Sequence, residues 1–135
     1  MLKDILIMNE KKHNLKSFDE GGWLLPIEFN ILDFIPKRVF IVNDVPPGEI
    51  RGNHSHYKTI QYLICTNGRV DVFLDNGKNV EKISLSKNES VLIPEMVWDT
   101  QQFLTDNAEI VVLCSTEYDI QDYILDYKKF KNLVQ

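Results

Sequence analysis

Two histidines separated by one residue are the side chains in this sequence best suited to chemistry. His54 and His56 follow Arg51-Gly52 and precede an apolar run, and they are two of only three histidines in the 135 residues. On a strand, side-chain alternation puts both on one face, where they can act on one ligand. A neutral imidazole, with a pKa of about 6.5, can accept a proton near neutral pH and return it. The pair therefore predicts a functional site.

Short strands separated by turns are the elements that must position this pair. Asn76-Gly77 suits a tight two-residue hairpin turn, and Pro26 favours an edge position for its strand. Even spacing of β-branched and aromatic runs predicts an all-β antiparallel sandwich or barrel. The expected strands are residues 5–8, Trp23 to Phe29, Lys37 to Val42, Thr59 to Thr66 (buried on both faces), Arg69 to Leu74, Asn79 to Leu85, Ser90 to Ile93, Val97 to Phe103 and Glu109 to Cys114.

The C-terminal segment changes to a helical period. From Asp122 to Val134 apolar residues recur every three or four positions, and Asp119 or Asp122 could cap the start. One amphipathic helix is expected to pack on the outside of the β-structure. The length suits one core, and no linker or repeat divides the chain, so residues 1–135 are predicted to form a single domain.

Composition excludes several classes of function. A net charge of −5 argues against nucleic-acid binding. No window is long and apolar enough to span a membrane, and the first residues lack a signal-peptide core, so a cytoplasmic location is expected. Cys65 and Cys114 lie in apolar runs and are expected to be buried, reduced thiols. The apolar stretch Phe29 to Ile35 suggests an oligomer interface.

The residues around the histidines match the intervals of a known motif. Gly48 is followed by five residues, His54-Ser55-His56, four residues, Gln61, six residues and Gly68. This resembles the first cupin motif, with Gln61 in the carboxylate position, and it implies a jelly-roll β-barrel. Because His56 and Gln61 are an odd number of residues apart, the chain is expected to bend or bulge between them.

The second cupin motif is incomplete. Pro94 is present, but Met96 stands in place of the expected glycine and Asp99 in place of the expected histidine. Two of four expected metal ligands are therefore altered, and Gln61 is a weaker ligand than a carboxylate. We expect a site without metal and no other cofactor.

From Lys37 onward the chain resembles the dTDP-4-keto-6-deoxyhexose 3,4-ketoisomerases, bacterial enzymes of the WxcM-like group. The resemblance implies a small jelly-roll homodimer with strands exchanged between subunits, acting on a dTDP-linked 4-keto-6-deoxy sugar in a pathway to a 3-amino sugar of surface glycans. The residues on which the resemblance rests are Lys37-Arg38-Val39-Phe40, Arg51-Gly52-Asn53-His54-Ser55-His56, Gln61, Asn67-Gly68, Val97-Trp98, and the ending Glu117-Tyr118-Asp119 through Asp122-Tyr123-Ile124 to Tyr127 and Phe130.

The sequence also departs from that family's pattern. Phe40 stands where a tyrosine is expected, and Tyr57 where a lysine is common. Asp99 replaces histidine or arginine, and Gly21 or its neighbour replaces arginine or tyrosine. Because the last two positions line the sugar pocket in the family, the configuration of the product at C4 stays open.

The resemblance assigns roles within this reaction. Moving a carbonyl from C4 to C3 requires removing a proton from C3, stabilising an enediol and returning a proton to C4. His56 is expected to be the main base, with His54 positioning it or shuttling the proton. Arg51 is expected to neutralise charge on the sugar oxygens or to bind the diphosphate, and Arg38 and Lys58 are expected to bind the diphosphate. Gln61 is expected to hydrogen-bond a sugar hydroxyl, and Trp98 to stack on a ring. Asp99 is expected to orient a histidine or relay a proton.

Alternative interpretations stay open from the residues alone. A 3,5-epimerase also removes a proton beside the C4 carbonyl, a sensor or scaffold cupin would bind the sugar nucleotide without turnover, and a metal-dependent oxygenase is a further possibility. Arg51 could instead pair with Glu49 or Asp71, and Trp98 could belong to the core. Asp99 could be a solvated strand residue, and Gln61 could satisfy backbone groups. His13 and the C-terminal aromatic residues are expected to be structural.

Overall fold

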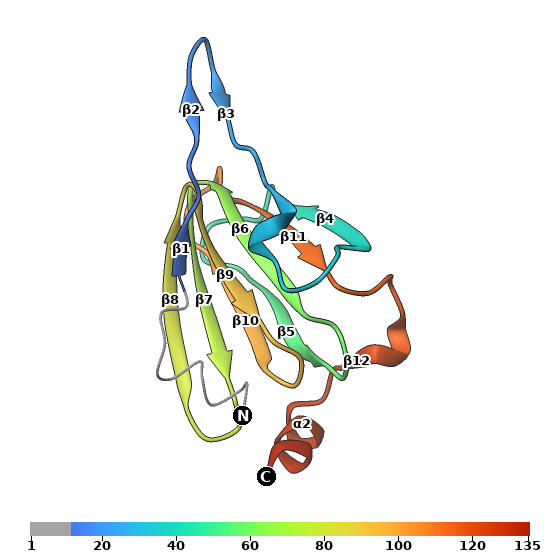
Figure 1. The fold of residues 1–135 in the computed structure, drawn as a ribbon. Helices are drawn as coiled ribbons and strands as arrows, with labels where there is room; N and C mark the ends of the chain where they lie inside the picture. Colours follow the sequence, from blue (N-terminus) through green and yellow to red (C-terminus); the bar gives the residue numbers. More distant parts are fainter. Residues whose placement is uncertain (1–11) are drawn as a thin grey trace.

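A computed structural model describes residues 12–135, so the strand expected at residues 5–8 lies outside the described residues. Two five-stranded antiparallel sheets face each other (Figure 1). In order across each sheet, the first contains β1 (Lys12–Asn14), β9 (Glu89–Ile93), β6 (Gln61–Asn67), β11 (Glu109–Cys114) and β4 (Arg38–Val42), and the second contains β12 (Tyr123–Ile124), β5 (Ile50–His56), β10 (Trp98–Phe103), β7 (Arg69–Asp75) and β8 (Val80–Ser86).

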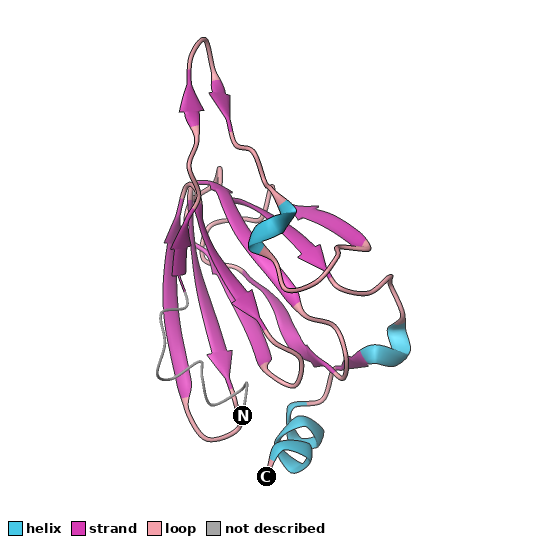
Figure 2. Cartoon of the chain, in the orientation of Figure 1, coloured by secondary structure: helices cyan, strands magenta, loops and turns pink. Residues whose placement is uncertain are grey.

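Strands dominate the chain, and the helical elements are short (Figure 2). A hairpin of β2 (Phe18–Asp19) and β3 (Trp23–Leu24) projects beyond the two sheets at the end opposite the C-terminal helix α2 (Tyr127–Val134). The 3-10 helices are η1 (Phe29–Ile31) and η2 (Ile120–Asp122). The all-β jelly-roll prediction with one C-terminal helix is confirmed. No helix within residues 12–135 has the length and apolar character needed to cross a membrane.

The core lies between the sheets and is built from alternating β-branched and leucine side chains. Leu63 and Cys65 of β6 face this core, whereas Tyr62 and Ile64 point outward. The outward pair is covered by apolar side chains from the segment that precedes β4, including Leu25, Ile27, Leu32 and Phe34. The prediction that this strand is buried on both faces is therefore confirmed.

Two predicted elements differ clearly in extent. The strand predicted over Trp23 to Phe29 pairs only at Trp23–Leu24, because Pro26 has no N–H to donate and Phe29 begins η1. The helix predicted from Asp122 begins at Tyr127, with Asp126 as its N-cap. Residues Tyr123–Ile124 pair with β5 instead, because their apolar and aromatic side chains pack there.

The hairpin between β7 and β8 has a four-residue loop rather than a two-residue turn. Asp75 pairs with Val80, so residues 76–79 form the connection. One backbone bond and three side-chain bonds hold this loop. The Asn76 N–H donates to the Asn79 carbonyl at 3.2 Å, Asp75 Oδ1 accepts from the Gly77 N–H at 2.7 Å, and Asn76 Oδ1 accepts from the N–H groups of residues 78 and 79. These local bonds outweigh the preference of Asn-Gly for a tighter turn.

Candidate active site

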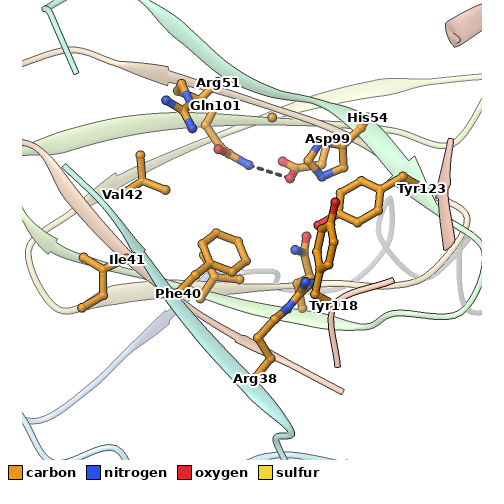
Figure 3. A pocket seen from close by; sticks show the side chains of 13 residues that line it. Arg38, Phe40, Ile41, Val42, Arg51, His54, Asp99, Gln101, Tyr118 and Tyr123 are labelled. Atoms are coloured by element: carbon orange, nitrogen blue, oxygen red, sulfur yellow. Dashed lines mark hydrogen bonds between the residues drawn. The ribbon is translucent and has the colours of Figure 1, made fainter. Parts of the chain in front are cut away.

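A cavity of about 460 Å³ lies between the two sheets, where the edge strand β4 faces β5 and β12 (Figure 3). Because its walls come from both sheets, residues far apart in the sequence meet there. The lining residues are Arg38, Phe40, Ile41, Val42, Arg51, Gly52, His54, Gln61, Asp99, Gln101, Val112, Tyr118 and Tyr123. Of the predicted site residues, it brings together Arg38, Arg51, His54, Gln61 and Asp99.

A bulge in β5 sets the direction of the histidines. Asp99 pairs with His54 and Thr100 pairs with Gly52, so Asn53 is the extra residue. Both Gly52 and Asn53 have positive φ, at 79° and 63°. This bulge was not predicted, because the expected bend or bulge lay between His56 and Gln61. Between His56 and Gln61 the chain crosses from the second sheet to the first.

His54 and His56 lie on one face of β5, as predicted. Their rings meet edge to face with centroids 5.0 Å apart, and Tyr123 contacts both rings. His54 lines the cavity, while His56 is only 4% exposed and lies outside the lining set. The Nε2 atoms of both histidines are buried and have no hydrogen-bond partner among the described residues. Neither atom is therefore engaged by another described side chain, and of the two rings only that of His54 lines the cavity.

Asp122 is the carboxylate that orients His56. Its Oδ2 lies 3.1 Å from His56 Nδ1 and also accepts hydrogen bonds from the backbone N–H and the hydroxyl of Thr59. Its Oδ1 accepts from the Lys58 N–H at 2.7 Å. Pairing of β12 with β5 places Asp122 there, because Tyr123 is the strand partner of His56.

Electrostatics keep the two histidines neutral. Burial and the neighbouring His54 lower the pKa of His56 to about 4, although Asp122 opposes the shift. Burial also lowers the pKa of His54. Burial would raise the pKa of Asp122, but its hydrogen bonds from Thr59, Lys58 and His56 lower it overall, so it is a carboxylate. His56 Nδ1 therefore carries the proton, and Nε2 is the basic atom.

Arg38 brings a cation to the opposite wall of the cavity. Its guanidinium lies over the rings of Phe40 and Tyr118, with centroid distances of 5.7 and 5.5 Å. Nη2 donates to Cys114 Sγ at 3.5 Å, and Nε is buried without a partner among the described residues. Arg51 is exposed at the cavity wall, and the ion pairs found within residues 12–135 do not include it. Both guanidinium groups can bind oxyanions.

Asp99 and Gln101 form a buried pair on β10. Gln101 Nε2 donates to Asp99 Oδ2 at 2.6 Å. Within the described part of the chain, Asp99 makes no hydrogen bond to a histidine, so orienting a histidine is the role of Asp122 rather than of Asp99. The solvated alternative for Asp99 is wrong, because its side chain is buried.

Two predicted binding residues lie away from the cavity. Trp98 is buried against Ile124 and Phe130, and its Nε1 donates to Asn53 Oδ1, so the core interpretation fits its position and stacking on a sugar does not. Lys58 is exposed outside the cavity lining, and its contribution to the site is its backbone N–H.

Sequence reasoning missed Asp122, Gln101, Tyr118 and Tyr123 as site residues. The sequence predicts only a helix-capping role for Asp122 and only packing roles for Tyr118 and Tyr123. The available signal was the Asp-Tyr-Ile ending, which marked the family resemblance without indicating a role.

The donor atoms do not fit a cupin metal centre. Of the four positions that hold the metal in a cupin, His54, Gln61 and Asp99 line the cavity and His56 does not. Gln61 is a neutral side chain, and Asp99 accepts a hydrogen bond from Gln101. Within residues 12–135 no three His, Cys, Asp or Glu side chains are grouped so that they could hold a metal ion.

Comparisons with known proteins agree with this architecture. The curated TDP-4-oxo-6-deoxy-alpha-D-glucose-3,4-oxoisomerase of Aneurinibacillus thermoaerophilus is 35% identical over 130 residues, which cover 94% of each chain. QdtA, a sugar 3,4-ketoisomerase from Thermoanaerobacterium thermosaccharolyticum solved in complex with TDP, is 32% identical with a TM-score of 0.84, and the match covers 91% of this chain and 92% of QdtA. A 3,4-ketoisomerase from Helicobacter canadensis is 30% identical with a TM-score of 0.85, covering 92% and 96% of the two chains.

The family model described as "FdtA: WxcM-like, C-terminal" matches residues 8–135, which is almost the whole chain. Together with relatives at this level of identity and coverage, the match shows that the chain belongs to the FdtA family of WxcM-like proteins.

Proposed function

We propose that this protein is a sugar-nucleotide 3,4-ketoisomerase that converts dTDP-4-keto-6-deoxy-D-glucose to a dTDP-3-keto-6-deoxyhexose. The observation that carries the proposal is the pair of neutral histidines beside a cavity, one of them oriented by a buried carboxylate. Relatives that match nearly the full chain are named as 3,4-ketoisomerases. The reaction makes 3-keto sugars that an aminotransferase can convert to 3-amino-3,6-dideoxy sugars.

The histidine pair moves the proton between the two sugar carbons. A neutral imidazole accepts the proton from C3 and, as imidazolium, returns it to C4. His56 is the base that Asp122 prepares, since its protonated Nδ1 leaves Nε2 free. His54 lies on the cavity wall beside it and positions the sugar or shuttles the proton.

Cationic and amide side chains bind the oxygen atoms of the substrate. Arg38 and Arg51 supply positive charge at the cavity, where each can bind the diphosphate or counter charge on the sugar oxygens. Gln61 is 3% exposed at the cavity wall and can donate to a sugar hydroxyl. The reaction uses no metal, because proton transfer at these carbons needs only the acid and base groups.

The active unit is a homodimer in the cytoplasm, with strands exchanged between subunits. In support, the outer face of the edge strand β4 exposes Val39 and Ile41, at 57% and 60%. Phe29 borders Val39 in a shallow apolar hollow on the same face. The β2–β3 hairpin projects beyond the two sheets, where it is open to contact with a second subunit (Figure 1). Such an apolar surface on a small domain favours association.

Incubation of the purified protein with dTDP-4-keto-6-deoxy-D-glucose in D₂O, with a chelator present, tests the proposal by NMR. The 3-keto isomer should accumulate, with deuterium at C4 to the extent that the imidazolium exchanges its proton with solvent before returning it. A parallel reaction in H₂O gives the H4–H5 coupling constant and so the configuration at C4. A 3,5-epimerase would instead place deuterium at C3 and C5. Unchanged substrate after prolonged incubation, in protein that binds dTDP, would refute the isomerase assignment and favour a non-catalytic binding protein.

A further inference from the structure

One oxygen of a buried carboxyl group at the cavity is unpaired. Asp99 is 2% exposed, and its Oδ2 accepts from Gln101 Nε2 at 2.6 Å. Its Oδ1 is also buried and has no hydrogen-bond partner among the described residues. Both side chains line the cavity, and Figure 3 shows the Asp99 carboxyl between the Gln101 amide and His54. A buried carboxyl oxygen without a partner needs either a ligand or a proton.

The β5 bulge makes room for this pair. A Cβ added at Gly52 would lie 2.9 Å from Gln101 Nε2 and 3.2 Å from the backbone oxygen of Asp99. Gly52 also has a φ of +79°, which disfavours other residues. The backbone of β5 is therefore shaped around the amide that holds Asp99.

The surroundings of Asp99 favour the protonated acid. Burial raises the pKa of Asp99 to about 7, and the hydrogen bond from Gln101 limits the increase. The strand partner of Asp99 on β7 is Leu74, which carries no charge. Its strand partner on β5 is His54, whose lowered pKa keeps the ring neutral near pH 7.

Four other charged or titratable side chains face this cavity. They are Arg51 on β5, Arg38 on β4, Tyr123 on β12 and Tyr118 in the loop before η2. Asp99 forms no ion pair with either arginine in the described part of the chain. Near neutral pH, Asp99 therefore exchanges readily between its acid and its carboxylate.

We propose that Asp99, clamped by Gln101, is the acid and base that serves the two reacting sugar oxygens, while the histidine pair serves the two carbons. This inference rests on the proposed ketoisomerase function. The geometry fits because O3 and O4 of the enediol are on adjacent carbons, so one carboxyl oxygen can reach both in turn. Gln101 is the positioning residue, since it fixes Oδ2 and leaves Oδ1 as the only oxygen free to act.

The proton balance closes over the complete reaction. As a histidine removes the C3 proton, the C3–H electron pair forms the C3–C4 double bond and the Asp99 O–H protonates O4, giving a neutral enediol. Asp99, now a carboxylate, then takes the proton from O3 as that C–O bond becomes the new carbonyl. The displaced π electrons form the C4–H bond with the proton held by the imidazolium. Both groups return to their starting states, and no oxidant or reductant is needed.

The pH dependence of kcat/KM tests this assignment. The wild-type value should fall as pH rises through about 7, because Asp99 must begin protonated. The histidines must begin neutral, so they cause a decrease only at acid pH. In Asp99→Asn, kcat should fall by about 10²- to 10⁴-fold, the decrease above pH 7 should disappear, and binding of dTDP should change less than about threefold.

Gln101→Leu tests the positioning role without removing the acid. Because the hydrogen bond from Gln101 lowers the pKa of Asp99, its loss should move the alkaline decrease in kcat/KM to higher pH. Gln102→Leu is the matched control, because Gln102 Nε2 donates to the Gly48 carbonyl and lies outside the cavity lining. Its profile should match the wild type.

The outcomes separate this inference from the proposed function. If the wild type is active, two results overturn the role of Asp99. One is that the decrease in kcat/KM above pH 7 persists in Asp99→Asn, and the other is that Asp99→Asn keeps more than a third of the wild-type kcat. An inactive wild type refutes the proposed function itself. If Gln101→Leu lowers kcat but leaves the alkaline decrease in kcat/KM at the same pH, Gln101 has a purely structural role and does not position Asp99.

Discussion

Replacing Asp122 by Asn tests whether the buried carboxylate prepares His56 for catalysis. The substitution keeps the shape of the side chain but removes the charge that holds the His56 Nδ1 proton. A hydrogen bond to a charged group contributes about 1.5–3 kcal/mol, which corresponds to about 10- to 150-fold in rate. An Asn amide can also donate to Nδ1 and favour the other tautomer, and loss of the orienting carboxylate of a histidine can cost about 10⁴ in kcat. The expected decrease in kcat therefore lies between about 10- and 10⁴-fold.

The same substitution should lower stability. The carboxylate accepts hydrogen bonds from the Lys58 N–H and from the N–H and hydroxyl of Thr59. An Asn side chain has one acceptor oxygen, so at least one buried donor loses its partner, at a cost of about 1–3 kcal/mol. Urea unfolding followed by circular dichroism measures this change. Turnover should then be assayed by NMR at a temperature where the variant is still folded.

Asp126→Asn is the matched control for this experiment. Asp126 is the N-cap of α2 and accepts from the Lys128 N–H at 3.0 Å, outside the cavity lining. Since Asn caps helices about as well as Asp, both kcat and stability should remain close to the wild-type values. Wild-type kcat in folded Asp122→Asn would show that Asp122 does not prepare His56.

Two further predictions concern the histidine itself and a turn in the fold. His56→Asn should fold but lose about two to four orders of magnitude in kcat, as expected for a lost acid–base group; near-normal turnover would place the base elsewhere. Gly68→Ala should destabilise the fold by about 2–5 kcal/mol in urea unfolding, because φ is +65° and a Cβ would lie 2.3 Å from Thr105 Oγ1 and 2.7 Å from Ala108 Cα. Gly48→Ala, with φ of +90° but open space, should cost only the backbone part of that value; equal losses in both variants would contradict the steric explanation.

Local patterns were sufficient to predict most of the strands. Val70, Val72 and Leu74 recur at every second position, and that period places them in the core between the sheets. The two histidines were predictable for the same reason, since a spacing of two residues on a strand puts them on one face. The observed structure differs from the prediction where a side chain bonds to the nearby backbone, as Asn76 does in its loop. Rules based on residue patterns do not include such bonds.

The rest of the site depends on pairing between distant strands. Asp122 is 66 residues from His56 in the sequence, and only the pairing of β12 with β5 brings them together. The three- and four-residue spacing of the apolar residues from Tyr123 to Val134 predicted a helix beginning at Asp122. Burial of Ile124 beside Trp98 favours the strand instead. Gln101 is likewise recognisable only once Gly52 is seen to leave room for it.

The pairing of β12 with β5 also bears on how the enzyme acquires its activity during synthesis. During synthesis the N-terminal residues leave the ribosome first, and contacts between distant residues close slowly. His56 therefore emerges long before Asp122, and most of both sheets can form around a histidine that has no orienting carboxylate. Catalytic activity should therefore appear only at the end of folding, when residues 120–124 pack against β5. Measured turnover is then a stricter test of complete folding than measured secondary-structure content.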